Sequence, residues 1–192
     1  MHSRWSDDEA RDYCQRFAAH GEALALRVYT SHLLGREPEL VLHGGGNTSV
    51  KTTALDLLGR SVDVLCVKGS GSDLSQVEPA GLPAVRLAPL RELQQLDRLS
   101  DAAMVDALRG ALLSSRSPNP SVEALLHAFL PHAFVDHTHA NAILALTDQP
   151  DPAAHVRAAF GDDILVLPWI MPGFPLAKAV AAAHAERPGV RG

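Results

Sequence analysis

Two short extended segments on either side of a glycine most constrain the fold of this chain. Residues 47–51 and 62–67 are rich in the β-branched side chains that strands favour, and Gly59 marks a turn between them. Antiparallel strands can be joined by a turn, whereas parallel strands need a long crossover connection. The pattern therefore predicts an antiparallel sheet rather than a doubly wound parallel one.

Segments with helical periodicity surround these strands. The apolar side chains between residues 7 and 34 recur near helical spacing and Gly35 follows them, which predicts one long or broken helix. Further helices are expected at 90–99, at 101–113, from Glu123 onward, at 141–147, at 152–160 and at 175–186. Further strands are expected at 40–43, at 85–87, around His137 and at 164–167. This order of elements predicts an α/β fold in a single domain over residues 1–192.

The composition narrows the class of protein. Hydrophobic residues make up 46% of the 192 positions and charged residues 20%, which is typical of a globular chain that buries a core. The net charge of -5 lacks the basic excess of a nucleic-acid-binding protein, so we expect no nucleic-acid partner. Residues 1–16 lack the apolar centre of a signal peptide, and no later stretch approaches the length of a membrane span. We therefore expect no membrane partner.

The two cysteines indicate a reducing compartment. Cys14 and Cys66 lie far apart in the sequence and outside any Cys-x-x-Cys spacing. This spacing suggests neither a disulfide framework nor a thiolate zinc site. We expect a cytoplasmic protein.

Two histidines separated by one residue indicate half of a metal site. Alternate side chains of an extended segment point to the same face, so His137 and His139 can reach one ion. Imidazole nitrogens are common ligands of zinc. Taken alone, the pair also fits amidohydrolases, which place such a pair on a strand, and histidines that are simply hydrogen-bonded in a core or at a surface.

A carboxylate precedes the histidine pair in the sequence. Glu123 follows Pro120 and Ser121, and Ser121 is expected to be the N-cap of a helix. A carboxylate in this place can act as a base beside a metal ion. His127 lies four residues after Glu123 and therefore on the same helix face, where we expect packing or a hydrogen bond to a ligand in preference to direct ligation.

Two glycine-rich segments can bind an anion or form tight turns. Residues 44–46 are glycines, and the second segment, 68–71, reads Lys-Gly-Ser-Gly. Neither has the ending of a phosphate-binding P-loop, and the first lacks the spacing of a dinucleotide-binding fingerprint. Glycine allows close approach of the backbone, whose N–H groups can bind an anion. Both interpretations remain open on the spacing alone.

The order of these motifs resembles the class II aldolase and adducin family. From about Leu40 onward the chain contains His-Gly-Gly-Gly-Asn-Thr-Ser at 43–49, Lys-Gly-Ser-Gly at 68–71, Pro-Ser-Val-Glu at 120–123 and His-Thr-His at 137–139. The segment 167–174 is similar to the aldolase-type domain that precedes a short-chain dehydrogenase domain in long bifunctional rhamnulose-1-phosphate aldolase/dehydrogenase proteins.

The resemblance implies a fold, a cofactor and a set of site residues. The implied fold is a three-layer αβα sandwich around a mixed, largely antiparallel sheet. The implied cofactor is a Zn²⁺ ion with three histidine ligands, of which His137 and His139 are two, and the implied general base or acid is Glu123. The residues that fall where the family binds a substrate phosphate are Asn47, Ser49, Gly69, Ser70, Gly71 and Ser121.

The chain departs from the family pattern at two places. Val122 stands where related aldolases often have a second hydroxyl residue before the glutamate. The family's third ligand lies in a Lys/Gln-His-Gly strand after the last helix, and residues 187–192 do not contain it, so we expect a domain truncated before that strand. The resemblance also implies a cyclic homotetramer whose site receives a neighbour's late tyrosine, whereas Tyr13 and Tyr29 are both early.

The activity implied is retro-aldol cleavage of a phosphorylated ketose, such as a rhamnulose-1-phosphate-like sugar, to dihydroxyacetone phosphate and an aldehyde. Sugar-phosphate epimerases of the same family share these motifs and remain an alternative. A non-catalytic adducin-like or truncated, inactive module is a second alternative. An amidohydrolase barrel is a third, although such a barrel usually needs about 250 residues.

Overall fold

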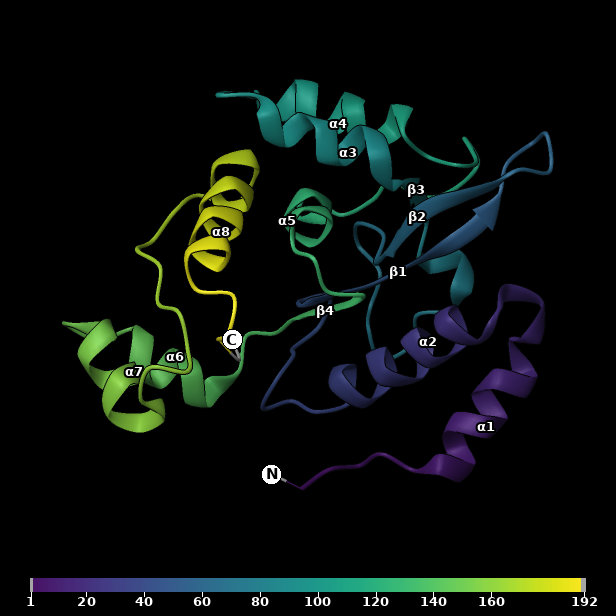
Figure 1. Ribbon diagram of the computed structural model, residues 1–192. Coiled ribbons are helices and arrows are strands. Elements are labelled where there is room, and N and C mark those ends of the chain that lie inside the picture. The colour runs from purple at the N-terminus through teal and green to yellow at the C-terminus, as the bar shows by residue number, and fades with distance from the viewer. Residues whose placement is uncertain (1, 191–192) are drawn as a thin grey trace.

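A four-stranded antiparallel sheet lies at the centre of the computed structural model, which describes residues 2–190 (Figure 1). The strand order is β3-β2-β1-β4, and every described pair is antiparallel. The strands are β1 (Asn47–Leu55), β2 (Ser61–Val67), β3 (Ala84–Arg86) and β4 (Phe134–His137). The predicted antiparallel pair is therefore confirmed as the β1–β2 hairpin, with Gly59 in its turn at φ 73°.

Helices cover both faces of this sheet, which gives the expected αβα layers. Figure 1 shows α1 and α2 on one side and α3, α4, α5 and α8 on the other, with α6 and α7 paired beyond β4. The helices are α1 (Asp7–Arg16), α2 (Glu22–Gly35), α3 (Leu87–Glu92), α4 (Asp101–Gly110), α5 (Ala124–Phe129), α6 (Asn141–Thr147), α7 (Pro152–Phe160) and α8 (Phe174–Glu186). Three short 3₁₀ turns lie at Ala18–His20, Pro79–Gly81 and Leu93–Gln95.

The first helical region is broken, as the sequence allowed. Ser6 caps α1 by accepting a hydrogen bond from the Glu9 N–H. The break falls at Gly21, whose φ of 83° suits glycine and turns the chain into α2. The two helices pack against each other, with Tyr13 and Tyr29 in ring contact at 5.0 Å between centroids.

Two predicted strands are wrong. Residues 40–43 are irregular or in turns, and His43 adopts the left-handed conformation, with φ 53°, which leads into the glycines instead of an extended ladder. Residues 164–167 are irregular, and no described strand pairs with them. Their apolar side chains are half-buried instead, and Leu165 and Leu167 line a cavity with Val180 of α8.

Alternation along β1 divides its side chains between two helical layers. Thr48 and Val50 face α2, where the Thr48 hydroxyl lies 2.8 Å from the Ser31 hydroxyl and Val50 joins the core. Ser49 and Lys51 face the opposite layer. The sheet therefore separates two sets of contacts made by neighbouring residues.

A hydrophobic core lies on each side of the sheet. The core against α1 and α2 contains Phe17, Leu24, Ala25, Val28, Val50, Val64, Cys66, Val77 and Leu82. The core against α3, α4, α5 and α8 contains Leu65, Val67, Val85, Leu87, Leu90, Met104, Leu108, Ala111, Leu112, Ala124, Leu125, Ala128, Phe174 and Ala177. Because apolar side chains are buried on both faces of the sheet, each face of a strand is committed to one helical layer.

An ion pair between a buried arginine and a half-exposed aspartate connects α2 to β4. The guanidinium of Arg27 is 1% exposed and lies 2.7 Å from the Asp136 carboxylate. It also donates a hydrogen bond to the Ser49 carbonyl and lies 5.4 Å from the centre of the Phe134 ring. One side chain thus connects the helix to both strands of the β1–β4 pair.

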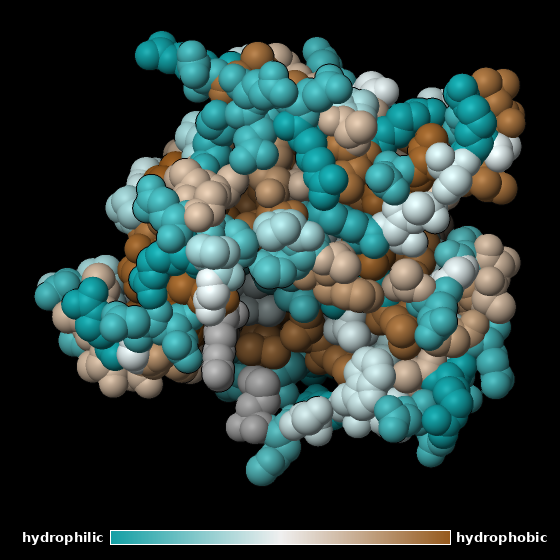
Figure 2. Space-filling model, viewed as in Figure 1, coloured by the Kyte–Doolittle hydropathy of each residue, from teal (hydrophilic) through white to brown (hydrophobic). Residues whose placement is uncertain are grey.

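Apolar side chains are also exposed at the tip of the β1–β2 hairpin. Figure 2 shows hydrophobic atoms gathered there, and Leu55, Leu57 and Leu58 are the exposed residues of that tip. Among the described residues, no helix has the length and apolar character needed to cross a membrane.

Candidate functional site

The pairing of β1 with β4 places the end of β4 beside the first glycine segment. His137 is the last residue of β4 and pairs with Asn47, the first residue of β1. Gly46 precedes Asn47 with φ 68°, and a Cβ at Gly46 would lie 2.9 Å from the His137 carbonyl oxygen. Glycine is therefore required here by both conformation and space.

The two predicted histidines lie side by side. The Nε2 atom of His137 is 3.0 Å from the Nε2 atom of His139, although His139 lies just beyond the strand. Its backbone N–H donates to the Leu40 carbonyl, which fixes the position of this residue. Two nitrogens about 2.0–2.1 Å from a single zinc ion are compatible with such a separation, so the pair fits an imidazole-preferring ion.

Glu123 lies against the same imidazole. Its Oε2 atom is 3.1 Å from Nδ1 of His137 and 3.5 Å from the Asn47 amide nitrogen. With its Nδ1–H donated to the carboxylate, His137 keeps the Nε2 lone pair for a metal, an arrangement common around zinc. Glu123, His137 and His139 therefore lie together at the end of β4.

The start of α5 differs slightly from the prediction. The first helical residue is Ala124, and Glu123 rather than Ser121 occupies the N-cap position. The Ser121 hydroxyl instead accepts a hydrogen bond from the Glu123 N–H at 3.2 Å. Ser121 therefore organises the turn that leads into the helix, which begins later than expected, so Glu123 is its N-cap and does not lie within its first turn.

Burial and hydrogen bonding act in opposite directions on Glu123. Burial raises the pKa of its carboxyl, but the hydrogen bond and charge of His137 and the Asn47 amide lower it, and the net pKa lies below the usual value. The side chain is 21% exposed. The carboxylate is therefore ionised at neutral pH and can accept a proton.

Within residues 2–190, no cluster of three His, Cys, Asp or Glu side chains converges on one point. His127, the other histidine of this region, is fully buried and hydrogen-bonded through Nδ1 to the Ser49 hydroxyl at 2.8 Å. Burial lowers its pKa to about 3, so it is neutral, and no described group is bonded to its Nε2. His127 therefore supports β1 rather than completing a ligand set.

Both glycine segments and the candidate metal residues line one cleft of about 260 Å³. The glycines at 44–46 form one wall and the segment 68–71 another, with Ser121, Glu123 and the two histidines between them. Most of these side chains come from the loops that precede or follow β1, β2 and β4. The cleft is therefore built at one end of the central strands.

Several backbone N–H groups predicted to bind phosphate already have acceptors. The N–H of Gly69 donates to the Gly81 carbonyl, that of Ser70 to the Asn119 carbonyl, and that of Ser121 to the Lys68 carbonyl. In the described part of the chain, no acceptor is bonded to the Gly71 N–H. Of the predicted phosphate-binding residues that line the cleft, those with donors available to an anion are therefore Gly71, through its N–H, and Ser70 and Ser121, through their hydroxyls.

Asn47 and Ser49 lie beneath the cleft rather than along it. Both residues are fully buried, and neither lines the cleft. Ser49 contacts His127, and Asn47 contacts Glu123. Asn47 therefore contacts the cleft through Glu123, whereas His127, the neighbour of Ser49, does not line it.

Sequence reasoning missed Lys68. Its Nζ atom donates to the Gly44 carbonyl at 2.7 Å and to the Ser72 carbonyl at 2.8 Å, so it connects the two glycine segments. Burial lowers its pKa, while the charges of Glu123 and Asp73 raise it. A lysine at the end of a buried strand and directly before a glycine turn was the only signal in the sequence.

A second cavity, of about 520 Å³, adjoins the cleft. Glu123 and His137 line both spaces. The second cavity is more apolar and includes Leu126, Ile143 and Leu176. Glu123 and His137 therefore stand between a polar space and a largely apolar one.

Known proteins share the sequence pattern and the fold of this chain. The model of the class II aldolase and adducin N-terminal domain matches residues 26–191. A relative from Bacillus subtilis (strain 168), named "Uncharacterized oxidoreductase YuxG", is 40% identical over 161 residues. That match covers 84% of this chain but only 23% of the relative, so the chain spans about a quarter of that protein's length.

A solved structure is also similar. It is the N-terminal class II aldolase domain of a conserved protein from Thermoplasma acidophilum, with a TM-score of 0.83 and 42% identity. The alignment covers 95% of this chain and 80% of that one. The sheet and its helical layers are therefore found in a solved relative.

Proposed function

This chain belongs to the class II aldolase and adducin family, and from that membership we propose that it is a zinc-dependent aldolase-type domain. Its substrate is a phosphorylated ketose, similar to rhamnulose-1-phosphate, and its products are dihydroxyacetone phosphate and an aldehyde. Residues 1–192 act as a single domain. As family resemblance implies, the working form is a homotetramer, and the compartment is the cytoplasm.

The arrangement of Glu123 with the two imidazoles is the observation that supports this proposal most. His137 and His139 would hold the zinc ion through Nε2, while the Nδ1–H of His137 is donated to Glu123. A bound divalent ion supplies an electron sink beside the substrate carbonyl. The same three side chains line a cleft with two glycine segments.

Glu123 is the base in the proposed reaction. Its ionised carboxylate takes the proton of the substrate hydroxyl, the carbon–carbon bond breaks, and the bonding pair passes to the ketose carbonyl oxygen as the aldehyde leaves. Glu123 then returns the proton to the carbon. The hydrogen bonds to Oε2 from His137 and Asn47 keep the carboxylate ionised and oriented.

The two adjoining spaces fit the two halves of such a substrate. We place the phosphate in the polar cleft, where the Gly71 N–H, the Ser70 and Ser121 hydroxyls and the positive charge of Lys68 are available. The carbon chain that leaves as the aldehyde extends toward the more apolar cavity. Asn47, Ser49 and Gly69 support these groups from behind.

A non-catalytic binding module is the second candidate. The observation in its favour is the ligand set, because the described residues supply two converging imidazoles and no third metal-binding side chain. Zinc with two protein ligands is held less tightly than with three. Measured zinc content and turnover separate the two candidates, and product identification separates an aldolase from an epimerase.

The test is Glu123→Gln in the zinc-loaded chain, assayed for dihydroxyacetone phosphate release from rhamnulose-1-phosphate. We expect kcat to fall by about 10²–10⁴-fold, the usual contribution of a general base, while bound zinc is unchanged. Glu186→Gln, an exposed change on α8, is the matched control and keeps full activity. Turnover that survives in Glu123→Gln would remove Glu123 from this role, and a zinc-loaded wild-type chain without product would favour the binding module.

A further inference from the structure

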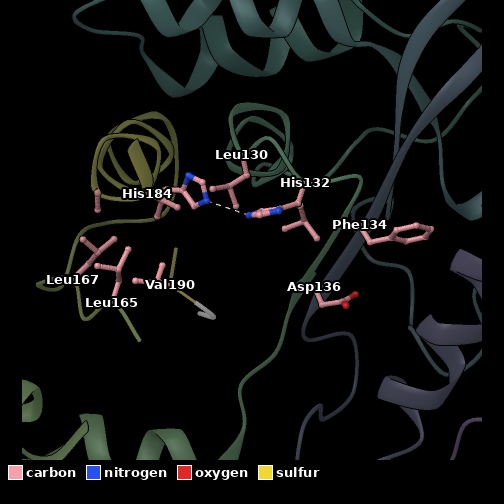
Figure 3. A pocket seen from close by; sticks show the side chains of 11 residues that line it. Leu130, His132, Phe134, Asp136, Leu165, Leu167, His184 and Val190 are labelled. Atoms are coloured by element: carbon pink, nitrogen blue, oxygen red, sulfur yellow. Dashed lines mark hydrogen bonds between the residues drawn. The ribbon is translucent and has the colours of Figure 1, made fainter. Parts of the chain in front are cut away.

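A second pair of histidines lies outside the candidate site. His132 is in the connection between α5 and β4, and His184 is on α8, yet their Nε2 atoms are 3.1 Å apart. The ring centroids are 5.1 Å apart and the ring planes cross at 84°. Figure 3 shows the two rings pointing toward each other from separate elements.

We propose that His132 and His184 form a second metal site, for a divalent transition ion that prefers imidazole, such as Zn²⁺, Cu²⁺ or Ni²⁺. Their separation of 3.1 Å is close to the 3.0 Å between His137 and His139. Two nitrogen ligands about 2.0–2.1 Å from one ion can have this separation. Calcium and magnesium prefer oxygen ligands, so the pair does not suit them.

The pair can change from a hydrogen bond to a metal site by moving one proton within a ring. Without metal, the Nε2–H of one ring donates to the Nε2 lone pair of the other. When an ion binds, the donor ring takes its other neutral tautomer, with the proton on Nδ1, and both Nε2 atoms donate lone pairs to the metal. Both ligands are then neutral imidazoles, the form in which histidine binds a metal.

The backbone that carries His132 is fixed before any ion arrives. The ammonium of Lys51 on β1 donates to the His132 carbonyl at 2.6 Å and to the His127 carbonyl at 2.7 Å. The other ligand, His184, lies on α8, which is a regular helix. Because the backbone of both ligands is already ordered, ion binding costs little backbone entropy.

The surroundings leave room for the rest of the coordination sphere. A cavity of about 370 Å³ adjoins the pair, with Leu165, Leu167 and Val180 among its walls. Asp136 lines the same cavity, but its carboxylate pairs with Arg27 at 2.7 Å. The site is therefore formed by two imidazoles, and water or a small ligand fills the other positions.

A metal ion bound at this site would link α8 to the segment between α5 and β4. An ion that binds the folded chain and not the unfolded chain stabilises the fold by mass action. The ligands are 52 residues apart in the sequence, so the link joins segments that no backbone turn holds together. The site is structural and stands apart from the cleft that holds Glu123.

Zinc titration of four proteins tests the proposal: the wild-type chain, His132→Gln, His184→Gln and the control His155→Gln, an exposed histidine on α7. We expect the wild type and the control to bind one more equivalent of Zn²⁺ than either of the other two. Affinity at the site should fall more than about tenfold, since even loss of an outer-shell partner costs that much. Equal binding in all four proteins would overturn the site.

The double variant His137→Asn/His139→Asn separates this site from the candidate centre. We expect it to keep one Cu²⁺ equivalent whose electron paramagnetic resonance spectrum shows two nitrogen ligands, and to lose that signal when His184→Gln is added. A double variant that binds no copper, or whose signal survives His184→Gln, would refute the proposal. If the double variant does not fold, the copper spectrum of His184→Gln is compared with that of the wild type. We expect His184→Gln to lack one two-nitrogen signal that the wild type shows, and identical spectra would refute the site.

Discussion

The two faces of the β1–β4 pair use polar residues for different purposes. On the α2 face, Thr48 contacts Ser31 and Asp136 pairs with Arg27, so the polar side chains join strand to helix. On the α5 face, Asn47 contacts Glu123 and Ser49 contacts His127, so the polar side chains support residues at or beneath the cleft. Neighbouring residues of β1 therefore stabilise the attachment to α2 on one face of the sheet and support the candidate site on the other face.

This difference indicates which substitutions should affect stability alone. A change on the α2 face breaks the attachment of the sheet to α2, far from the cleft. A change on the α5 face disturbs the buried layer beneath Glu123 and His137. The following predictions test whether the two faces are separable.

The largest loss of stability is expected for Asp136→Asn. This change leaves the Arg27 guanidinium, which is 1% exposed, without its carboxylate. We expect the free energy of unfolding to fall by about 3 kcal/mol, the lower end of the range for breaking a buried pair, because Asp136 is half exposed. Urea denaturation at pH 7 measures it.

Asp12→Asn, at an exposed position of α1, is the matched control for that change and should leave the midpoint nearly unchanged. Equal stability of Asp136→Asn and the wild type would show that the α2 face does not depend on this pair.

The second prediction concerns acid and the α5 face. Burial lowers the pKa of His127 from 6.5 to about 3, so the folded chain excludes a proton that the unfolded chain binds below pH 6.5. Stability should therefore be complete above pH 6.5 and fall as the pH drops toward 3, by up to about 1.4 kcal/mol per pH unit. At pH 5 the loss from this group is about 2 kcal/mol by the same relation.

Denaturation curves at pH 7 and pH 5 for His127→Gln and for the control His155→Gln measure this contribution. The control should keep the wild-type pH dependence, and His127→Gln should show a smaller one. Identical slopes in both variants would contradict the burial of a neutral His127.

Ser49→Ala should be the next most costly change. It removes the hydroxyl bonded to Nδ1 of His127, whose Nε2 has no partner in the described chain, so both ring nitrogens become unpaired. We expect a loss of about 1.5 kcal/mol, within the range for a buried polar group left without a partner. Thermal unfolding monitored by circular dichroism measures it, and an unchanged midpoint would contradict this account.

The smallest effect is expected for the neighbouring change Thr48→Val. The Ser31 hydroxyl loses one contact but still donates to the Arg27 carbonyl at 2.6 Å. The loss should be about 0.5–1 kcal/mol, the net contribution of one hydrogen bond. Parallel measurement with Ser49→Ala compares adjacent positions on opposite faces, and a larger loss for Thr48→Val would reverse the comparison.

The sequence predicted the elements whose signals are local. The β1–β2 hairpin and most helices followed from periodicity, capping residues and glycine stops, all of which act within a few residues. The helix expected at 90–99 is instead α3, which begins earlier at Leu87 and ends in the 3₁₀ turn Leu93–Gln95, and the one expected at 101–113 ends at Gly110. The segments 40–43 and 164–167 were wrong because an apolar run resembles a strand whether or not a partner strand is present. Pairing is a property of the tertiary structure, and the left-handed His43 ends the first run.

In the candidate site too, the sequence predicted what depends on local patterns and missed contacts that form only in the folded chain. The closeness of His137 and His139 followed from their spacing, and the position of Glu123 beside them followed from family resemblance. The acceptors that occupy the Gly69 and Ser70 N–H groups come from Gly81 and Asn119, and no local pattern reveals such contacts. Lys68 was missed for the same reason, because its role depends on two loops that meet only in the fold.

The contacts of Lys68 have a consequence for how a ligand would enter the cleft. Its ammonium holds the carbonyl of Gly44 and that of Ser72, directly after the second glycine segment, so the opposing walls are set during folding. If the ligand is the proposed phosphate ester, it would meet a preorganised cradle and spend little of its binding energy on ordering loops. Loss of this lysine would therefore appear in calorimetry as a less favourable entropy of association as well as a missing charge.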